Sequence, residues 1–167
     1  MKYYIKATMD NMTAAYDGYQ YKMGVNKHPD PDTSNRLCSR GFHLACTPKD
    51  ALVYTPGATE LYLCTARKVY ARSDNKLRCG EVNILWRIPM PEEFIKARAA
   101  FIKARDAFIK ALAAPNTAWA ASKARAASDK AWAVYIKAWA ASNKARAALG
   151  EDFMAAVIKQ YESEEKK

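Results

Sequence analysis

Long apolar runs are missing from the sequence. No stretch of about 18 residues is free of charged side chains, as a membrane-spanning helix would require. Residues 1–6 contain two lysines and lack the apolar core of a secretory signal. No glycine-rich RNA-binding tract accompanies the basic residues either. We therefore expect a cytoplasmic protein without membrane contact, and nucleic acid is not the favoured partner.

Cysteine and acidic residues are in short supply over much of the chain. The four cysteines, Cys38, Cys46, Cys64 and Cys79, all lie in the first half, and without an export signal we expect free thiols. The 17 acidic residues face 27 basic ones, which gives a formal net charge of +10 at pH 7. Residues 94–149 alone carry 11 basic and 2 acidic side chains. This charge indicates anionic partners.

A seven-residue repeat, by contrast, runs without interruption over most of the stretch from Phe94 to Leu149. Alanine, the strongest helix former, fills 22 of these 56 positions. The repeat breaks only at Pro115-Asn116, so we predict two antiparallel helices joined there, with a left-handed supercoil. The lysines that begin the repeats are Lys96, Lys103, Lys110, Lys123, Lys130, Lys137 and Lys144.

Local signals predict where these helices begin and end. Pro91 and the two acidic residues after it favour a helix start, and we expect this helix to end near Ala114. Thr117 is placed to cap the second helix, and Gly150 is a natural C′ residue for its end. A third, shorter helix is expected from Glu151 to about Tyr161.

The first of these helices carries two apolar stripes about 100° apart around its axis. One stripe can face the second helix, and the other needs a further partner, either the rest of the chain or another subunit. We therefore predict a homo-oligomer, most simply a dimer. The lysines beside the stripes, spaced about 10 Å apart, offer an alternative as a ladder for phosphates. The stripes are Phe94, Phe101 and Phe108, and Ile95, Ile102 and Ile109.

Residues 1–90 lack the repeat and are typical of a β-rich domain with one short helix. Thr47, Pro48 and Asp50 predict the start of that helix, which ends near Tyr54. Breakers between Asn26 and Asn35 favour a loop. The expected strands are Lys2–Thr8, Tyr19–Met23, Glu60–Ala66, Lys68–Ala71 and Glu81–Ile88, with a turn at Ser73–Lys76.

The densest group of chemically versatile residues runs from Cys38 to Cys46. Gly41 permits a tight bend that can aim Arg40 and His43 at one point. Tyrosines elsewhere in the domain can supply stacking faces, and a cation can meet a phosphate. The candidate ligand-binding residues are Arg40, His43, Tyr19, Tyr21, Tyr62 and Lys6.

Two other interpretations of this group stay open. Cys38, His43 and Cys46 with a fourth ligand from Cys64 or Cys79 would suit zinc, although the C-x4-H-x2-C spacing is not a recognised knuckle. Alternatively, His43 is a core residue hydrogen-bonded between strands. We predict neither a metal nor a cofactor.

Residues 1–90 contain several short motifs: Gly18-Tyr19-Gln20-Tyr21, Gly24, Cys38-x-Arg40-Gly41-Phe42-His43-x-x-Cys46, Asp50-Ala51-Leu52-x-Tyr54 and Leu61-Tyr62. Together they resemble a small domain of unknown function that occurs in bacteriophages and bacteria. Some members of that family carry Ala/Lys/Arg-rich heptads after the domain. The resemblance implies a phage or mobile-element origin and no assigned activity.

Residues 1–90 contain a strand, a Gly-bounded segment, a strand leading into a helix, and a late strand starting with glutamate. This order resembles that of ADP-ribosyltransferases, in which the strand before the helix is Ser-rich. Gly41–Ala45 and the following helix would be the middle part, and Glu81 would be the catalytic carboxylate. The first strand lacks the Arg or His that usually holds NAD, and the Ser-Thr-Ser motif is absent. The shared order is compatible with a related scaffold that does not perform the reaction.

These features together predict an α+β protein with a head domain of residues 1–90 and a helical domain of residues 91–167. We expect a phage-type, non-enzymatic binding protein whose head takes a small anionic, nucleotide-like ligand or a host defence factor. Such a protein would act as an anti-defence sponge. The alternatives are an ADP-ribosyltransferase-like enzyme that uses Glu81, and an oligomeric helical structural or nucleic-acid-binding protein.

Overall fold

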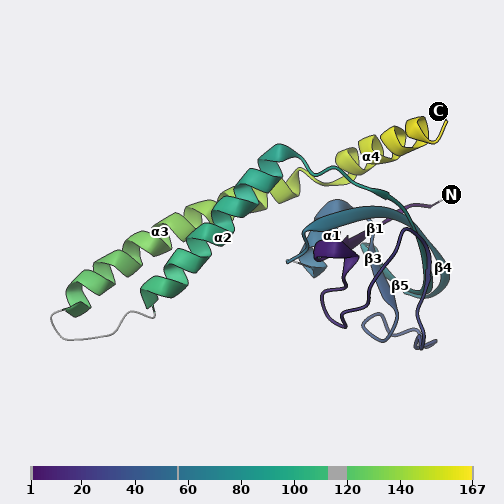
Figure 1. The fold of residues 1–167 in the computed structure, drawn as a ribbon, viewed down its shortest axis with the longest axis horizontal. Coiled ribbons are helices and arrows are strands. Elements are labelled where there is room, and N and C mark those ends of the chain that lie inside the picture. Colours follow the sequence, from purple (N-terminus) through teal and green to yellow (C-terminus); the bar gives the residue numbers. More distant parts are fainter. Residues whose placement is uncertain (1, 56, 113–119, 167) are drawn as a thin grey trace. The chain divides into compact units, whose positions relative to one another are not determined.

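The computed structural model describes residues 2–55, 57–112 and 120–166 of the chain (Figure 1). The chain has an α+β architecture, as predicted, and divides into two compact units. One unit, which we call the head, comprises Met1–Met90 and Ala148–Lys167, and the other, the hairpin, comprises Pro91–Ala147. The last helix therefore clusters with the head and not, as expected, with the heptad helices of residues 91–147.

One antiparallel sheet of five strands forms the head. β5 pairs with β2, β3 and β4, while β1 pairs with β3 and β4. The pairings β5–β3–β1–β4–β5 thus form a closed ring, and the sheet curls around its core (Figure 1). The strands are β1 (Tyr4–Thr8), β2 (Gly24–Lys27), β3 (Phe42–Ala45), β4 (Glu60–Arg72) and β5 (Lys76–Arg87).

Strand β4 closes the ring because it is long and bent. Its first residues pair with β1 and its later ones follow β5 over most of their length. Register shifts at Leu63/Cys64 and Val69/Ala71 mark bulges, and Lys68 has a φ of 52°. Since bulges bend a strand and increase its twist, they allow one strand to serve two neighbours.

Three of the expected strands are placed differently by the structure. Tyr19–Met23 contains only an isolated bridge, and the strand begins at Gly24. The aromatic alternation there reflects ring packing, because Tyr19 and Tyr21 lie 5.0 and 5.3 Å from the Phe42 ring. Residues 68–71 belong to the later part of β4 and are not a separate strand. Strand β5 starts at Lys76 and not at residue 81, since residues 76–79 pair with β3 and residues 77–79 also pair with β4.

The short helix α1 (Pro48–Tyr54) forms where its sequence signals predict. The Thr47 hydroxyl accepts the Asp50 N–H at 3.1 Å and donates to the Asp50 carboxylate at 2.7 Å. This cap satisfies a backbone donor that the first turn leaves unpaired. α1 contacts β1 and β3, and a single 3₁₀ turn, η1 (Asp10–Met12), follows β1.

The C-terminal helix α4 (Glu151–Glu164) extends three residues beyond its expected end. It buries Met154, Val157 and Tyr161, and the Tyr161 ring meets Tyr3 edge-on at 5.9 Å. Gly150 has a φ of −80° and is the N-cap of α4. The expectation of a C′ glycine is therefore wrong, because no left-handed residue is needed where the next helix begins at once.

The hairpin consists of α2 (Glu92–Leu112) and α3 (Ala120–Ala147). Phe101 lies 5.5 Å from Tyr135, and Phe108 lies 5.1 Å from Trp132, measured between ring centroids. The phenylalanine stripe therefore faces α3, as one of the two stripes was expected to do. The predicted turn at Pro115-Asn116, the Thr117 cap and the end of the first helix near Ala114 lie outside the described residues. Within those residues, none of the helices is both long enough and apolar enough to cross a membrane.

The packing between α2 and α3 can be tested by substituting a residue in the seam. We expect Phe101→Asp to lower the helix content and melting temperature of the hairpin, because a carboxylate would replace a ring packed on Tyr135. The expected loss is about 2–4 kcal/mol. Far-UV circular dichroism during thermal unfolding measures it. Ala99→Asp, at an exposed position of the same helix, is the control; equal effects of the two variants would contradict the seam.

Candidate functional site

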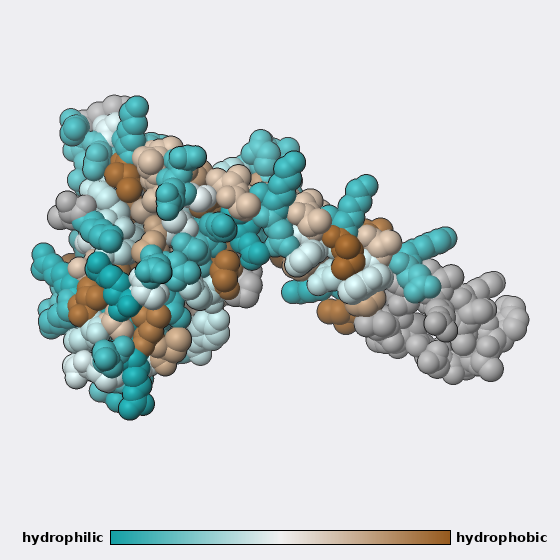
Figure 2. All heavy atoms as spheres, turned by 180° about the vertical axis from the view of Figure 1, so that it is seen from behind, coloured by the Kyte–Doolittle hydropathy of each residue, from teal (hydrophilic) through white to brown (hydrophobic). Residues whose placement is uncertain are grey.

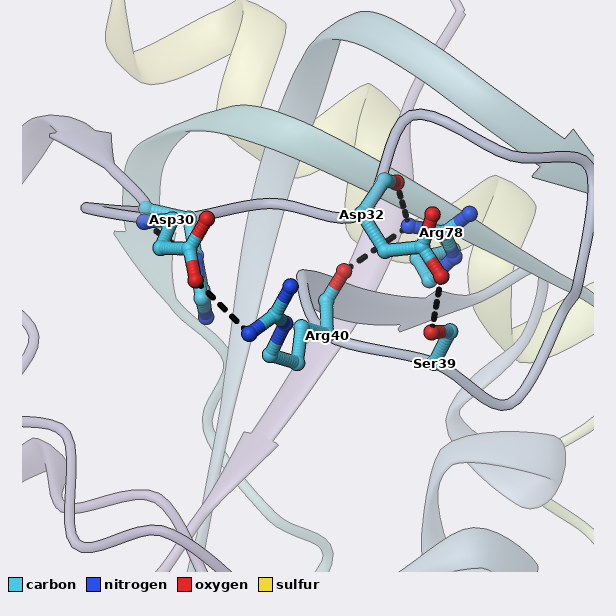
Figure 3. A network of polar contacts seen from close by, with 6 residues as sticks. Asp30, Asp32, Ser39, Arg40 and Arg78 are labelled. Atoms are coloured by element: carbon cyan, nitrogen blue, oxygen red, sulfur yellow. Dashed lines mark hydrogen bonds and ion pairs between the residues drawn. The ribbon is translucent and has the colours of Figure 1, made fainter.

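A buried arginine organises the loop between β2 and β3. Arg78 on β5 is fully buried, and its guanidinium donates to the carbonyl oxygens of four loop residues, of which Figure 3 shows Asp32 and Arg40. The Nε–Arg36 O and Nη1–Arg40 O distances are 2.7 and 2.8 Å, and the other two acceptors are Asp32 O and Ser34 O. The loop therefore wraps around one guanidinium group, whose N–H groups donate to these carbonyl oxygens.

Side chains of the same loop reinforce this arrangement. The Asp32 carboxylate accepts the Ser39 hydroxyl and the Ser34 N–H, the latter at 2.8 Å, and these bonds hold the pKa of Asp32 well below its usual range (Figure 3). Arg40 forms an exposed ion pair with Asp30 at 2.8 Å. Hydrogen bonds and an ion pair within the loop thus add to the contacts with Arg78, and together they fix the position of the loop relative to β3.

A cavity of about 530 Å³ lies beside this loop. Its walls come from β1, the segment after η1, the loop end near Gly41, strand β3 and helix α1. Gly41 has a φ of 142°, and a Cβ there would come within 3.0 Å of the Cys79 carbonyl oxygen. Glycine is therefore required where the loop passes over β5. Four predicted residues line the cavity: Lys6, Tyr21, Arg40 and His43.

Lys6 has an unusual environment for a lysine. Its side chain is buried on β1, and burial lowers the pKa of its amine to about 8. Nζ donates to the His43 carbonyl at 3.3 Å and lies 4.7 Å from the centre of the Tyr21 ring. Among the described residues no carboxylate forms an ion pair with it. The amine is therefore a buried cation without a direct ion pair among the described residues, and the charge of Asp17 on the same cavity wall acts on it from farther away.

His43 is a neutral group on the cavity wall. Its Nε2 lies 2.9 Å from the Leu37 carbonyl oxygen, which can only accept, so Nε2 carries the proton and Nδ1 is an acceptor. Burial is the main reason why the pKa of His43 is lowered, and the nearby cations Lys6, Lys76 and Arg78 act in the same direction. The expected hydrogen bond between strands is instead a bond to the loop.

The cavity wall also contains Lys76, Tyr16 and Tyr54, which were not among the predicted ligand-binding residues. Lys76 Nζ lies 4.5 Å from the Tyr54 ring centre and 3.2 Å from Cys38 Sγ. The Tyr16 hydroxyl donates to the Tyr54 carbonyl at 2.8 Å, which links the segment after η1 to the end of α1. Lys76 lies in the expected turn Ser73–Lys76, and tyrosine is common in both strands and helices. The sequence therefore did not indicate these residues as candidates for ligand binding.

The other predicted residues lie elsewhere in the head. Tyr62 is buried in the core, and burial followed by a hydrogen bond to Glu60 raises its pKa to about 12. Tyr19 lines a separate depression together with Glu81, whose carboxylate lies 3.8 Å from Arg67. The predicted catalytic Glu81 therefore does not line the cavity that contains Lys6 and His43.

The cysteines do not assemble around His43. All four are free, as the sequence predicts, and Cys64 and Cys79 are buried, which raises the pKa of both thiols. Among the described residues no three His, Cys, Asp or Glu side chains are placed to hold a metal ion. The zinc interpretation of Cys38, His43 and Cys46 thus finds no support in the described part of the chain.

The fold and the site together define a small α+β domain with a basic cavity beside a loop held by a buried arginine. Residues 2–97 match the family described as Domain of unknown function (DUF7666), and the chain belongs to this family. The match agrees with the resemblance noted from the Gly-Phe-His motif. No curated protein and no solved structure matches the chain.

Arg78 is open to a direct test. We expect Arg78→Lys to destabilise the head by about 3 kcal/mol, because an ammonium cannot reach four carbonyls spread over the loop and would leave some of them unpaired. Urea unfolding followed by circular dichroism measures the loss. Arg67→Lys keeps a positive charge on a largely exposed side chain, 3.8 Å from the buried Glu81 carboxylate in the unchanged protein, and should cost less than about 0.5 kcal/mol. Similar losses in both variants would show that the loop does not depend on Arg78.

Proposed function

We propose that the head is a non-enzymatic binding module for a small organic anion, nucleotide-like in size, held in the cavity beside Lys6. The observation that carries this proposal is the buried Lys6 amine, which has one carbonyl and one ring face as neighbours. A buried charge is costly when it is not paired. A phosphate or carboxylate would offset this cost by a charge-assisted hydrogen bond.

The charges on the cavity wall support the same ligand class. Lys6, Arg40 and Lys76 line the cavity, and Asp17 is the acidic residue among the lining side chains. His43 offers the Nδ1 acceptor described above, and Tyr54 offers a ring. A volume of about 530 Å³ lies within the range of small-molecule pockets, roughly 300–1,000 Å³. An anionic group with an attached polar ring system would satisfy these features.

The biological role that we attach to this site is sequestration. The resemblance to phage domains supports a protein that removes a small anionic signal from a host defence pathway, or that occupies a host defence factor. A mass spectrum of small molecules that co-purify with the protein would identify the ligand. A phosphate- or carboxylate-bearing compound lost from Lys6→Met protein would support the role.

The binding proposal predicts a dependence on Lys6. In isothermal titration with AMP and with cyclic dinucleotides, we expect at least one of these probes to bind. Lys6→Met should weaken that binding at least tenfold, which corresponds to about 1.4 kcal/mol. Lys159→Met, at an exposed position of α4, is the control and should bind like the unchanged protein. Binding that survives Lys6→Met would place the anion elsewhere.

The lowered pKa of Lys6 predicts how binding changes with pH. The free amine loses its proton as pH rises through about 8, while an anion binds the protonated form. Above that pH, binding must therefore take up a proton, and affinity should fall up to tenfold per pH unit. The charge of AMP is constant there, since a phosphomonoester has its second pKa near 6. Titrations between pH 7 and 10 test this, and a flat profile would contradict the role of Lys6.

A further inference from the structure

The hairpin carries an apolar face that its own packing does not cover. The isoleucine stripe on α2 and three large residues on α3 keep between 39% and 55% of their surface exposed. Figure 2 shows such apolar side chains interleaved with hydrophilic ones along the hairpin. We call this set the Ile/Trp face: Ile95, Ile102, Ile109, Trp132, Ile136 and Trp139.

The members of the Ile/Trp face lie on the same side of the hairpin. Phe101 and Tyr135 meet in the seam, and Ile102 and Ile136 each follow one position later. One position turns a side chain about 100° around its helix. When two helices are antiparallel, the residues one position after the seam residue on each helix point to the same side of the pair. The two helices therefore present one shared apolar face.

Rows of lysine border this face on both edges. Each isoleucine of α2 is followed by a lysine, as Ile102 is by Lys103, and Ile136 is followed by Lys137. Residues 94–149 carry 11 basic and 2 acidic residues in all. A second copy docked on this face would set like charges against each other, which is unfavourable. Charge complementarity instead favours an acidic occupant, in place of the homo-oligomer that the stripes alone predicted.

The seven-residue period of the Ile/Trp face favours a helix as its occupant. On a straight helix, a stripe of this period drifts about 20° per heptad, and it stays in line only against another helix with which it supercoils. A lipid surface imposes no such register. Small alanines between the large residues also allow a helix to approach closely, and an apolar groove with spaced anchors is a common receptor for an amphipathic helix.

We propose that the Ile/Trp face is a docking surface for an acidic amphipathic helix of a partner protein. The partner helix would lie along this face and contact both α2 and α3, with its apolar residues against Ile102 and Ile136 and its carboxylates toward the flanking lysines. Docking would complete a three-helix bundle. The site is independent of the ligand cavity, because its residues all belong to the hairpin.

Binding of a designed peptide to the full-length protein tests the Ile/Trp face. The probe is a fluorescent helical peptide of about three heptads with leucine at a and d and glutamate at e and g. Its matched control has lysine in place of each glutamate. We expect the acidic peptide to bind at least tenfold more tightly in fluorescence anisotropy. Binding should weaken as salt is raised, because lysine–carboxylate pairs contribute to it.

Two charge-matched variants locate the interaction. Ile102→Glu should weaken binding of the acidic peptide at least tenfold, whereas Val134→Glu should leave it within about twofold. Val134 precedes Tyr135, is exposed, and turns to the opposite side of the seam. Equal binding of both peptides, or equal effects of both variants, would overturn the proposal. So would binding to phosphatidylserine vesicles without peptide binding, or a light-scattering dimer that Ile102→Glu dissociates.

Discussion

The head depends on a single buried guanidinium. Arg78 is fully enclosed, and its hydrogen bonds go to main-chain carbonyls of the loop between β2 and β3. Each of those carbonyls would otherwise need water or another donor, and burying them unpaired would cost about 1–3 kcal/mol apiece. The loop has few apolar residues of its own to bury. Its conformation is therefore set by the arginine and by the Asp32–Ser39 contact, with little help from hydrophobic packing.

This constraint explains why the cavity has a defined shape. The loop ends at Gly41, where the backbone passes so close to β5 that a side chain would meet the Cys79 carbonyl. Directly beyond it, β3 presents His43 toward the loop, and the Leu37 carbonyl selects its tautomer. Lys76 approaches the same wall from the start of β5. A wall made by one strand and one cross-linked loop keeps these polar groups at fixed separations, as a binding site requires.

The sequence predicts those parts of this architecture that depend on local signals. Thr47 and Asp50 mark the cap of α1, and the heptads mark α2 and α3, because capping and helical periodicity act over a few residues. The role of Arg78 was not predicted, since its acceptor Arg36 lies 42 residues away. The burial of Lys6 was also missed, although Lys6 was named as a candidate. In a strand that alternates, a lysine is expected on the exposed face, and here the closed sheet buries both faces of β1.

Lys6 and Arg78 are the buried cations among the described residues of the head, and they differ in how fully their donors are paired. The Nε and both Nη atoms of Arg78 already donate to loop carbonyls, so a ligand could gain little from it. Lys6 donates to one carbonyl, that of His43, and a hydrogen bond from a charged donor contributes about 1.5–3 kcal/mol net. An anion about 4 Å from the amine would gain about 4 kcal/mol at an effective dielectric constant near 20, before the ligand's own desolvation. Because an ammonium group has three donors, an anion can bind Lys6 without displacing the His43 carbonyl, while the Arg78 network stays intact and holds the wall in place.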